Sequence, residues 1–216
     1  MRTKKALAVW LVAVLVAVAG NEARSLHQDR KAAPGPRANY FPNLVLKTHQ
    51  GKEVRFYDDV MKGDKIILMN FTYAQCNGIC PGTTRNLVKV QQMLGDRVGK
   101  DIFMYTITLT PEQDTPEVLA EYVKSYQVGK GWTFLTGTTQ QTELIRRLVG
   151  FVDPNPNLDK DKANHSGLVL VGNESIDRWM QCPGQGNPER IVDAIIWAES
   201  PNMKKTRRHV VERGGI

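Results

Sequence analysis

Cys76 and Cys80 are separated by three residues, Asn77, Gly78 and Ile79. Residues four apart come within about 6 Å in a helical turn, inside the Cα separation of about 4.4–6.8 Å that a disulfide requires. The same spacing lets both sulfurs face one metal ion. The pair can therefore form a disulfide, act as a dithiol or chelate a metal.

The cysteine pair stands where a buried strand is expected to give way to a helix. Residues 65–73 are mostly apolar, which suits a strand covered on both faces, and 81–94 carry a helical apolar stripe closed by Gly95. Pro81 suits the first helical position. Free backbone N–H groups and the helix dipole lower the pKa of a thiol there. A static structural disulfide is the alternative, but so short a closure removes little unfolded-state entropy.

His165 is the one histidine of four that stands directly before a buried-strand pattern, at 168–171. In a layout that gathers strand ends at one edge, the loop entering that strand packs beside the cysteine loop. Two thiolates and an imidazole suit copper, because copper(I) favours sulfur and copper(II) tolerates imidazole. Zinc with an added water also fits. The residues favour copper and leave zinc open.

The remaining pattern predicts an α/β fold in which a mixed central sheet is flanked by helices. The order is that of a thioredoxin-like core, with an N-terminal hairpin and an inserted β-α unit before the final strand pair. The expected elements are a hairpin of 43–47 and 53–57 turning at 50–51, strands at 65–73, 102–109 and 132–135, helices at 81–94, 116–126 and 139–149, paired strands at 168–171 and 176–180 turning at 172–173, and a helix at 188–198.

The N-terminal residues 1–20 resemble a secretory signal, with three basic residues before an uncharged apolar run. That run has about 14 residues, short of the roughly 20 needed to span a membrane, so a cleaved signal is expected and an uncleaved anchor is the alternative. Residues 21–40 read as a linker, 41–200 as the thioredoxin-like domain and 201–216 as a basic tail. We expect a periplasmic or secreted protein of a bacterial envelope, or one anchored in the membrane by this segment.

The formal net charge of +7 comes from the two ends of the chain. Between 21 and 200 the numbers of basic and acidic residues are equal. No basic face is implied, so nucleic acid is not an expected partner. The basic tail is expected to be a solvated end, with weak attraction to anionic lipid as the alternative.

Three motifs occur in order and carry a family resemblance that spans about residues 41 to 200: Phe71-Thr72-Tyr73 leading to Cys76-x-x-x-Cys80-Pro81, then Leu109-Thr110-Pro111-Glu112-Gln113-Asp114-Thr115-Pro116, then Asn164-His165-Ser166. The chain resembles the Sco/SenC family of copper chaperones for cytochrome c oxidase assembly. The resemblance implies a copper site made by Cys76, Cys80 and His165. It also implies delivery of copper to, or thiol reduction of, an oxidase copper-site subunit or another copper protein.

The chain departs from the family pattern at two places. Members often carry proline and an acidic residue between the cysteines, where this chain has Asn77, Gly78 and Ile79. They also often carry an acidic residue at the position of Thr110. The three implied ligands are present.

A metallochaperone is expected rather than an enzyme, with a thiol-disulfide oxidoreductase as the alternative. In that alternative Cys76 and Cys80 are a redox-active pair that reduces the copper-site cysteines of a partner. A three-residue spacer, where thioredoxin-type enzymes have two, argues against it, and only metal binding gives His165 a clear role. A peroxidase is weaker still, because it too leaves His165 without a purpose.

Two further residues have structural and functional interpretations. Cys182, placed after the last strand, is the spare thiol: it is either an inert, partly buried residue or a resolving thiol or auxiliary ligand. Asp114 precedes Thr115 as N-cap and Pro116 as first helical residue, so a structural role at a helix start is expected.

Overall fold

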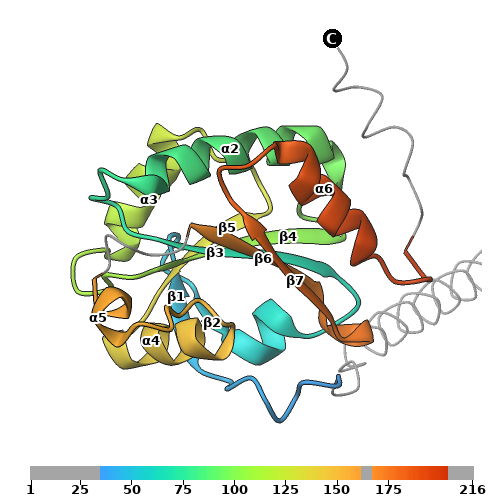
Figure 1. Ribbon diagram of the computed structural model, residues 1–216, viewed down its shortest axis with the longest axis horizontal. Coiled ribbons are helices and arrows are strands. Elements are labelled where there is room, and N and C mark those ends of the chain that lie inside the picture. The colour runs from blue at the N-terminus through green and yellow to red at the C-terminus, as the bar shows by residue number, and fades with distance from the viewer. Residues whose placement is uncertain (1–34, 162–166, 204–216) are drawn as a thin grey trace, which may run out of the picture. The chain divides into compact units, whose positions relative to one another are not determined.

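Within the residues that the computed structural model describes, 35–161 and 167–203, seven strands form one mixed sheet (Figure 1). Their order across the sheet is β2-β1-β5-β4-β3-β6-β7. Strand β3 runs parallel to β4, and β4 parallel to β5, whereas β6 runs antiparallel to β3. The expected mixed sheet is confirmed. The strands are β1 (Val45–Thr48), β2 (Glu53–Arg55), β3 (Ile66–Thr72), β4 (Ile102–Thr108), β5 (Trp132–Thr136), β6 (Leu168–Asn173) and β7 (Arg178–Pro183).

Helices cover both faces of this sheet. Figure 1 shows α2, α3 and α6 on one side and α4 and α5 on the other. The chain order β3-α2-β4-α3-β5-α4-β6-β7-α6, after the β1–β2 hairpin, is the expected thioredoxin-like order with its inserted unit. The helices are α2 (Ile79–Leu94), α3 (Pro116–Ser125), α4 (Thr139–Leu148), α5 (Pro156–Asp159) and α6 (Pro188–Trp197).

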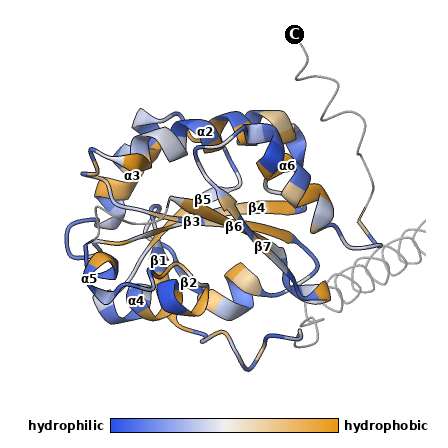
Figure 2. Cartoon of the chain, viewed as in Figure 1, coloured by the Kyte–Doolittle hydropathy of each residue, from blue (hydrophilic) through white to orange (hydrophobic). Residues whose placement is uncertain are grey.

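Strand β3 lies at the centre of the core, and every one of its residues is buried. Ile66 and Leu68 face the side of α2, α3 and α6, while Ile67, Met69 and Phe71 face the side of α4. Figure 2 shows the central strands as a mostly hydrophobic layer between helices of mixed hydropathy. Side chains that alternate between two buried faces explain the continuous apolar run of this strand.

The second strand of the N-terminal hairpin is shorter than expected. Strand β2 ends at Arg55, and Phe56–Met61 form a π-helical turn instead of continuing the strand to 57. The buried side chains of this turn are Phe56, Tyr57, Val60 and Met61, which recur at the spacing of a helix and not of a strand. Phe56 and Tyr57, at the start of this turn, have a local preference for a strand. Burial of the four side chains against the core overrides that preference and stabilises the helical turn.

The final strand pair turns later than expected. Strand β6 continues through Gly172 and Asn173, and the connection is a 3₁₀ turn at Glu174–Ile176. Gly172 is opposite Trp179, where an added Cβ would lie 2.1 Å from the indole ring. The glycine is therefore needed for close packing across the strands and does not mark a turn.

The last residues of the expected linker contact the domain. The Gly35 N–H donates to the Tyr57 hydroxyl at 2.9 Å, and the Arg37 N–H donates to Glu174 at 2.9 Å. The expected signal segment 1–20 and nearly all of the basic tail lie outside the described residues. In the part of the chain that is described, no helix has the length and hydropathy needed to cross a bilayer.

Candidate functional site

The loop after β3 brings Cys76 and Cys80 into contact. A tight turn closes where the Cys76 N–H donates to the Tyr73 carbonyl at 3.2 Å. Helix α2 then starts with Gly78 as its N-cap, and the Cys80 thiol donates a hydrogen bond to the Cys76 sulfur. Both cysteines are buried, Cys76 being 6% exposed and Cys80 1%. The structure confirms that the pair lies at a helix N-terminus.

Helix α2 begins at Ile79, two residues before the expected start at Pro81. The early start places Cys80 inside the first turn. Pro81 becomes the third helical residue, where its missing N–H still costs no helical hydrogen bond because the first four N–H groups have no partner within the helix. In α2 the proline therefore marks the first turn of the helix and not its first residue, whereas α3 and α6 begin at a proline.

The two thiols have opposite shifts in pKa. Burial would raise the pKa of Cys76, but hydrogen bonds from the Cys80 thiol, from the N–H groups of Cys80 and Gly78 and from the Tyr73 hydroxyl hold it below its ordinary value. Burial, aided by the hydrogen bond to Cys76, raises the pKa of Cys80 to about 12. Cys76 is therefore the thiol that ionises first, and Cys80 is its buried donor.

Tyr73 supplies a further donor to the Cys76 sulfur. This hydrogen bond is the main cause that raises the pKa of Tyr73, and burial adds to it, so that the value reaches about 12. A phenol with so high a pKa stays protonated at neutral pH and keeps donating to the thiolate. Tyr73, the first residue after β3, thus takes part in the site.

The opposite shifts predict a two-step thiol titration. In a Cys182→Ser background, thiolate absorbance in the ultraviolet is expected to rise in one step with a midpoint below 9.0, from Cys76, and in a second step near 12, from Cys80. In Cys80→Ala the first midpoint is expected to rise, because the thiolate loses a donor. One step with the amplitude of two thiols near 9.0 would contradict the arrangement.

Asp114 belongs to this site as well, which the sequence interpretation missed. Thr115 does cap α3, accepting the Val118 N–H at 3.4 Å, but capping leaves Asp114 unexplained. Its buried carboxylate accepts the N–H of Ala74, in the cysteine loop. The signal that could have found it was its place in the motif 109–116, between a strand end and a helix cap.

Cys182 lies within β7 and not after the last strand as expected, because β7 extends to Pro183. It is opposite Val169, and its thiol contacts the Val169 carbonyl at 3.7 Å. Burial raises its pKa, and its side chain packs in the core beneath α6. The arrangement is that of a small apolar core residue. All three cysteines are free thiols.

His165 lies in 162–166, outside the described residues, so its predicted place at the site stays a prediction. The described residue that follows that segment packs against the first residue of α2, next to Cys80. Gly167 packs so closely on Ile79 that an added Cβ would lie 2.4 Å from the Ile79 side chain, and Asp161 interacts electrostatically with Tyr73. Within the described ranges, no three histidine, cysteine or acidic residues form a metal-binding group.

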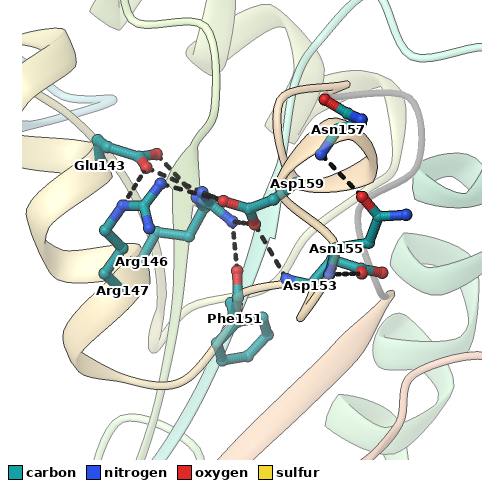
Figure 3. A network of polar contacts seen from close by, with 8 residues as sticks. All are labelled: Glu143, Arg146, Arg147, Phe151, Asp153, Asn155, Asn157 and Asp159. Carbon is teal, nitrogen blue, oxygen red and sulfur yellow. Dashed lines mark hydrogen bonds and ion pairs between the residues drawn. The ribbon is translucent and has the colours of Figure 1, made fainter.

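An ionic network fixes the segment that leads toward 162–166 (Figure 3). Arg146, on α4, binds both oxygens of Asp159 at 2.7 and 2.8 Å, both oxygens of Glu143 at 2.9 and 2.8 Å, and the Phe151 carbonyl at 2.5 Å. Arg147 adds a contact to Asp159 at 3.0 Å. A cavity of about 260 Å³ lies between α4 and this segment. The network ties α5 to α4 at the edge of the domain.

Comparison with known proteins assigns the family. The SCO1/SenC family model matches residues 34–198. A protein of Stutzerimonas stutzeri described as copper-binding is 29% identical over 140 residues, covering 63% of this chain and 66% of that protein. The structure of BsSco, a member of the Sco family of cytochrome c oxidase assembly proteins, has a TM-score of 0.60 at 19% identity, over 74% of this chain and 92% of that chain.

The structure of Arabidopsis thaliana ScoI with copper bound has a TM-score of 0.56 at 21% identity, over 76% of this chain and 96% of that chain. These likenesses support the thioredoxin-like fold. The chain spans about two thirds or less of the length of the curated relatives it matches. Because the family model matches well over half of its residues, this chain belongs to the SCO1/SenC family.

Proposed function

We propose that this protein is a copper-binding metallochaperone that holds copper on Cys76, Cys80 and His165. The observation that carries the proposal is the contact between two sulfurs at the first turn of α2, one of them favoured as thiolate. Thiolate sulfur is the ligand that copper(I) prefers in proteins. The copper-binding description of one relative and the copper-bound structure of another support copper as the cargo.

The position of Gly167, the residue that follows 162–166, supports His165 as the third ligand. His165 precedes Gly167 by two residues, a stretch of chain that reaches at most about 7 Å, and Gly167 contacts the neighbour of Cys80. His49, by contrast, accepts the Phe134 N–H at 3.1 Å and lies beside the β1–β2 turn. His49 is therefore the matched control for any test of His165.

Anaerobic titration of the reduced protein with copper(I), in competition with a chromophoric chelator, tests the proposal. We expect one copper per chain. His165→Ala is expected to lower the affinity by at least about 10-fold, since even an outer partner of a metal ligand contributes about 10- to 100-fold. His49→Ala is expected to keep the wild-type affinity. The proposal fails if the wild-type protein takes up no copper, and the role of His165 fails if the two variants bind alike.

A thiol-disulfide oxidoreductase is the second candidate, and the thiol asymmetry favours it. A thiolate at Cys76 beside a protonated Cys80 is the arrangement in which one sulfur attacks a disulfide and the other resolves the mixed disulfide. Reduction of a small disulfide substrate without copper tests it. Rapid turnover by His165→Ala would favour the reductase, because a metal ligand has no role in that reaction.

Residues 1–20 and the family support a location and a partner. We propose that the protein acts in a bacterial envelope, in the periplasm or held to the membrane by its N-terminal segment, and supplies copper to an oxidase copper-site subunit. The support is the basic and apolar pattern of 1–20 and the oxidase-assembly description of BsSco. Cell fractionation tests the location, and copper-dependent oxidase activity in a strain lacking this protein tests the partner.

A further inference from the structure

The carboxylate of Asp114 is buried, 1% exposed, and accepts hydrogen bonds from uncharged donors. The Ala74 N–H lies 3.2 and 3.3 Å from its two oxygens. The Thr110 hydroxyl donates at 3.1 Å, and the Thr108 hydroxyl donates to the same oxygen. Among the residues that the structure describes, no arginine, lysine or histidine forms an ion pair with it. Burying a carboxylate without a paired cation costs free energy, which its hydrogen bonds must offset. The segments that these hydrogen bonds join therefore indicate its structural role.

These bonds join two neighbouring strand ends. Thr108 ends β4 and is in register with Thr72, which ends β3, and the next backbone N–H, that of Leu109, donates to the Thr72 carbonyl at 2.8 Å. Beyond this last sheet bond the two chains separate, one into the cysteine loop and the other into the loop before α3. Beyond this point, the hydrogen bond from the Ala74 N–H to the Asp114 carboxylate joins the two loops.

The bond to Ala74 acts on the turn that carries Cys76. In that turn the Cys76 N–H bonds to the Tyr73 carbonyl, so the N–H of Ala74, the second residue, is left for an outside acceptor. Asp114 supplies the acceptor. Fixing this N–H sets the direction in which the turn projects Cys76 toward Cys80 and toward the hydroxyl of Tyr73.

We infer that Asp114 is a positioning residue that holds the Tyr73–Cys76 turn so that both sulfurs meet at the start of α2. Its effect on copper rests on the proposed function, whereas its effect on the turn does not. Glu174 is the matched control: it is a buried carboxylate that accepts a backbone N–H, of Arg37, and a hydroxyl, of Tyr57. It follows the end of β6 that pairs with the start of β3, so it lies at the opposite end of the sheet.

The test compares Asp114→Ala with Glu174→Ala by amide hydrogen exchange and by copper(I) affinity. In Asp114→Ala, exchange at Ala74 and Cys76 is expected to rise at least about 10-fold, and copper affinity to fall about 10- to 100-fold, as for an outer partner of a ligand. In Glu174→Ala both readouts at the site are expected to stay at the wild-type level. The inference is overturned if Asp114→Ala keeps the wild-type exchange rates and copper affinity. It is also overturned if Glu174→Ala changes both readouts as much as Asp114→Ala does.

Asp114→Asn carries the same test if Asp114→Ala does not fold. Its amide oxygen can still accept from Ala74, but a neutral acceptor is weaker than a carboxylate, so a smaller change of about 3-fold in the same direction is expected. Wild-type values in this variant overturn the inference. If the wild-type protein binds no copper, the proposed function fails, and amide exchange at Ala74 alone decides the role of Asp114.

Discussion

Replacing Cys80 with serine is expected to lower the affinity for copper(I) by more than about 100-fold, because loss of an outer partner alone costs about 10- to 100-fold. The substitution exchanges a sulfur ligand for a neutral hydroxyl, which copper(I) binds poorly. Cys76→Ser is expected to lose at least as much, since Cys76 is the thiol favoured as thiolate. Chelator competition under anaerobic conditions measures both.

Cys182→Ser is the control for these two variants. It makes the same chemical change at another buried cysteine, whose thiol contacts the Val169 carbonyl within the strand pair. We expect it to keep the wild-type copper affinity. The assignment of Cys76 and Cys80 is contradicted if either serine variant binds as tightly as wild type, or if Cys182→Ser loses as much. Preference for zinc over copper in an equimolar competition would overturn copper as the cargo.

Replacing Asp159 with asparagine is expected to lower the free energy of unfolding by about 3 kcal/mol at neutral pH, the low end of the range for breaking a buried ion pair. The side chains of Arg146 and Asp159 are 11% and 7% exposed, so the arginine would lose its buried partner in a poorly solvated place. Glu143 still contacts Arg146 and limits the loss. Urea denaturation measures the difference.

The effect of this substitution should depend on pH in a defined direction. Hydrogen bonds from Arg146 hold the pKa of the Asp159 carboxyl well below its usual range, against burial, which would raise it. A group whose pKa is lower in the folded protein contributes its full stability above the unfolded value, about 3.9, and loses it as the pH falls through the folded value. The stability difference between wild type and Asp159→Asn should therefore shrink as the pH drops below about 4.

Asp177→Asn is the matched control for Asp159→Asn. Asp177 also pairs with an arginine, Arg37 at 2.7 Å, but the two side chains are 38% and 41% exposed. Exposed pairs contribute about 0–1 kcal/mol, and asparagine tolerates the left-handed backbone of Asp177, where φ is 48°. A cost equal to that of Asp159→Asn at neutral pH, or a difference that does not change with pH, would contradict the role given to the Arg146 network.

The parts of the fold that the sequence predicted well are those with strong local signals. The continuous apolar run of β3 indicated a strand buried on both faces, and the structure confirms it. Thr115 caps α3, as a threonine before an apolar helical pattern is expected to do. Helix caps and the periodicity of apolar side chains depend on residues that are close together in the chain, so they can be predicted directly from the sequence.

The parts predicted wrongly are those where contacts between distant residues override local preference. Phe56–Met61 form a helical turn because four of their side chains reach the core at helical spacing. Gly172 continues a strand because Trp179 packs over it, although Gly-Asn is a common turn pair. In both cases the deciding partner lies outside the local window that a propensity describes.

The cysteine pair shows where the contribution of sequence ends. Spacing and position alone indicated that Cys76 and Cys80 lie together at a helix N-terminus, because residues four apart in one turn must be close. Only the tertiary structure decided that Cys76 is the stabilised thiolate and Cys80 its buried donor, and that Asp114 holds their loop. Those properties depend on burial and on hydrogen bonds between residues up to 40 positions apart, which folding alone brings together.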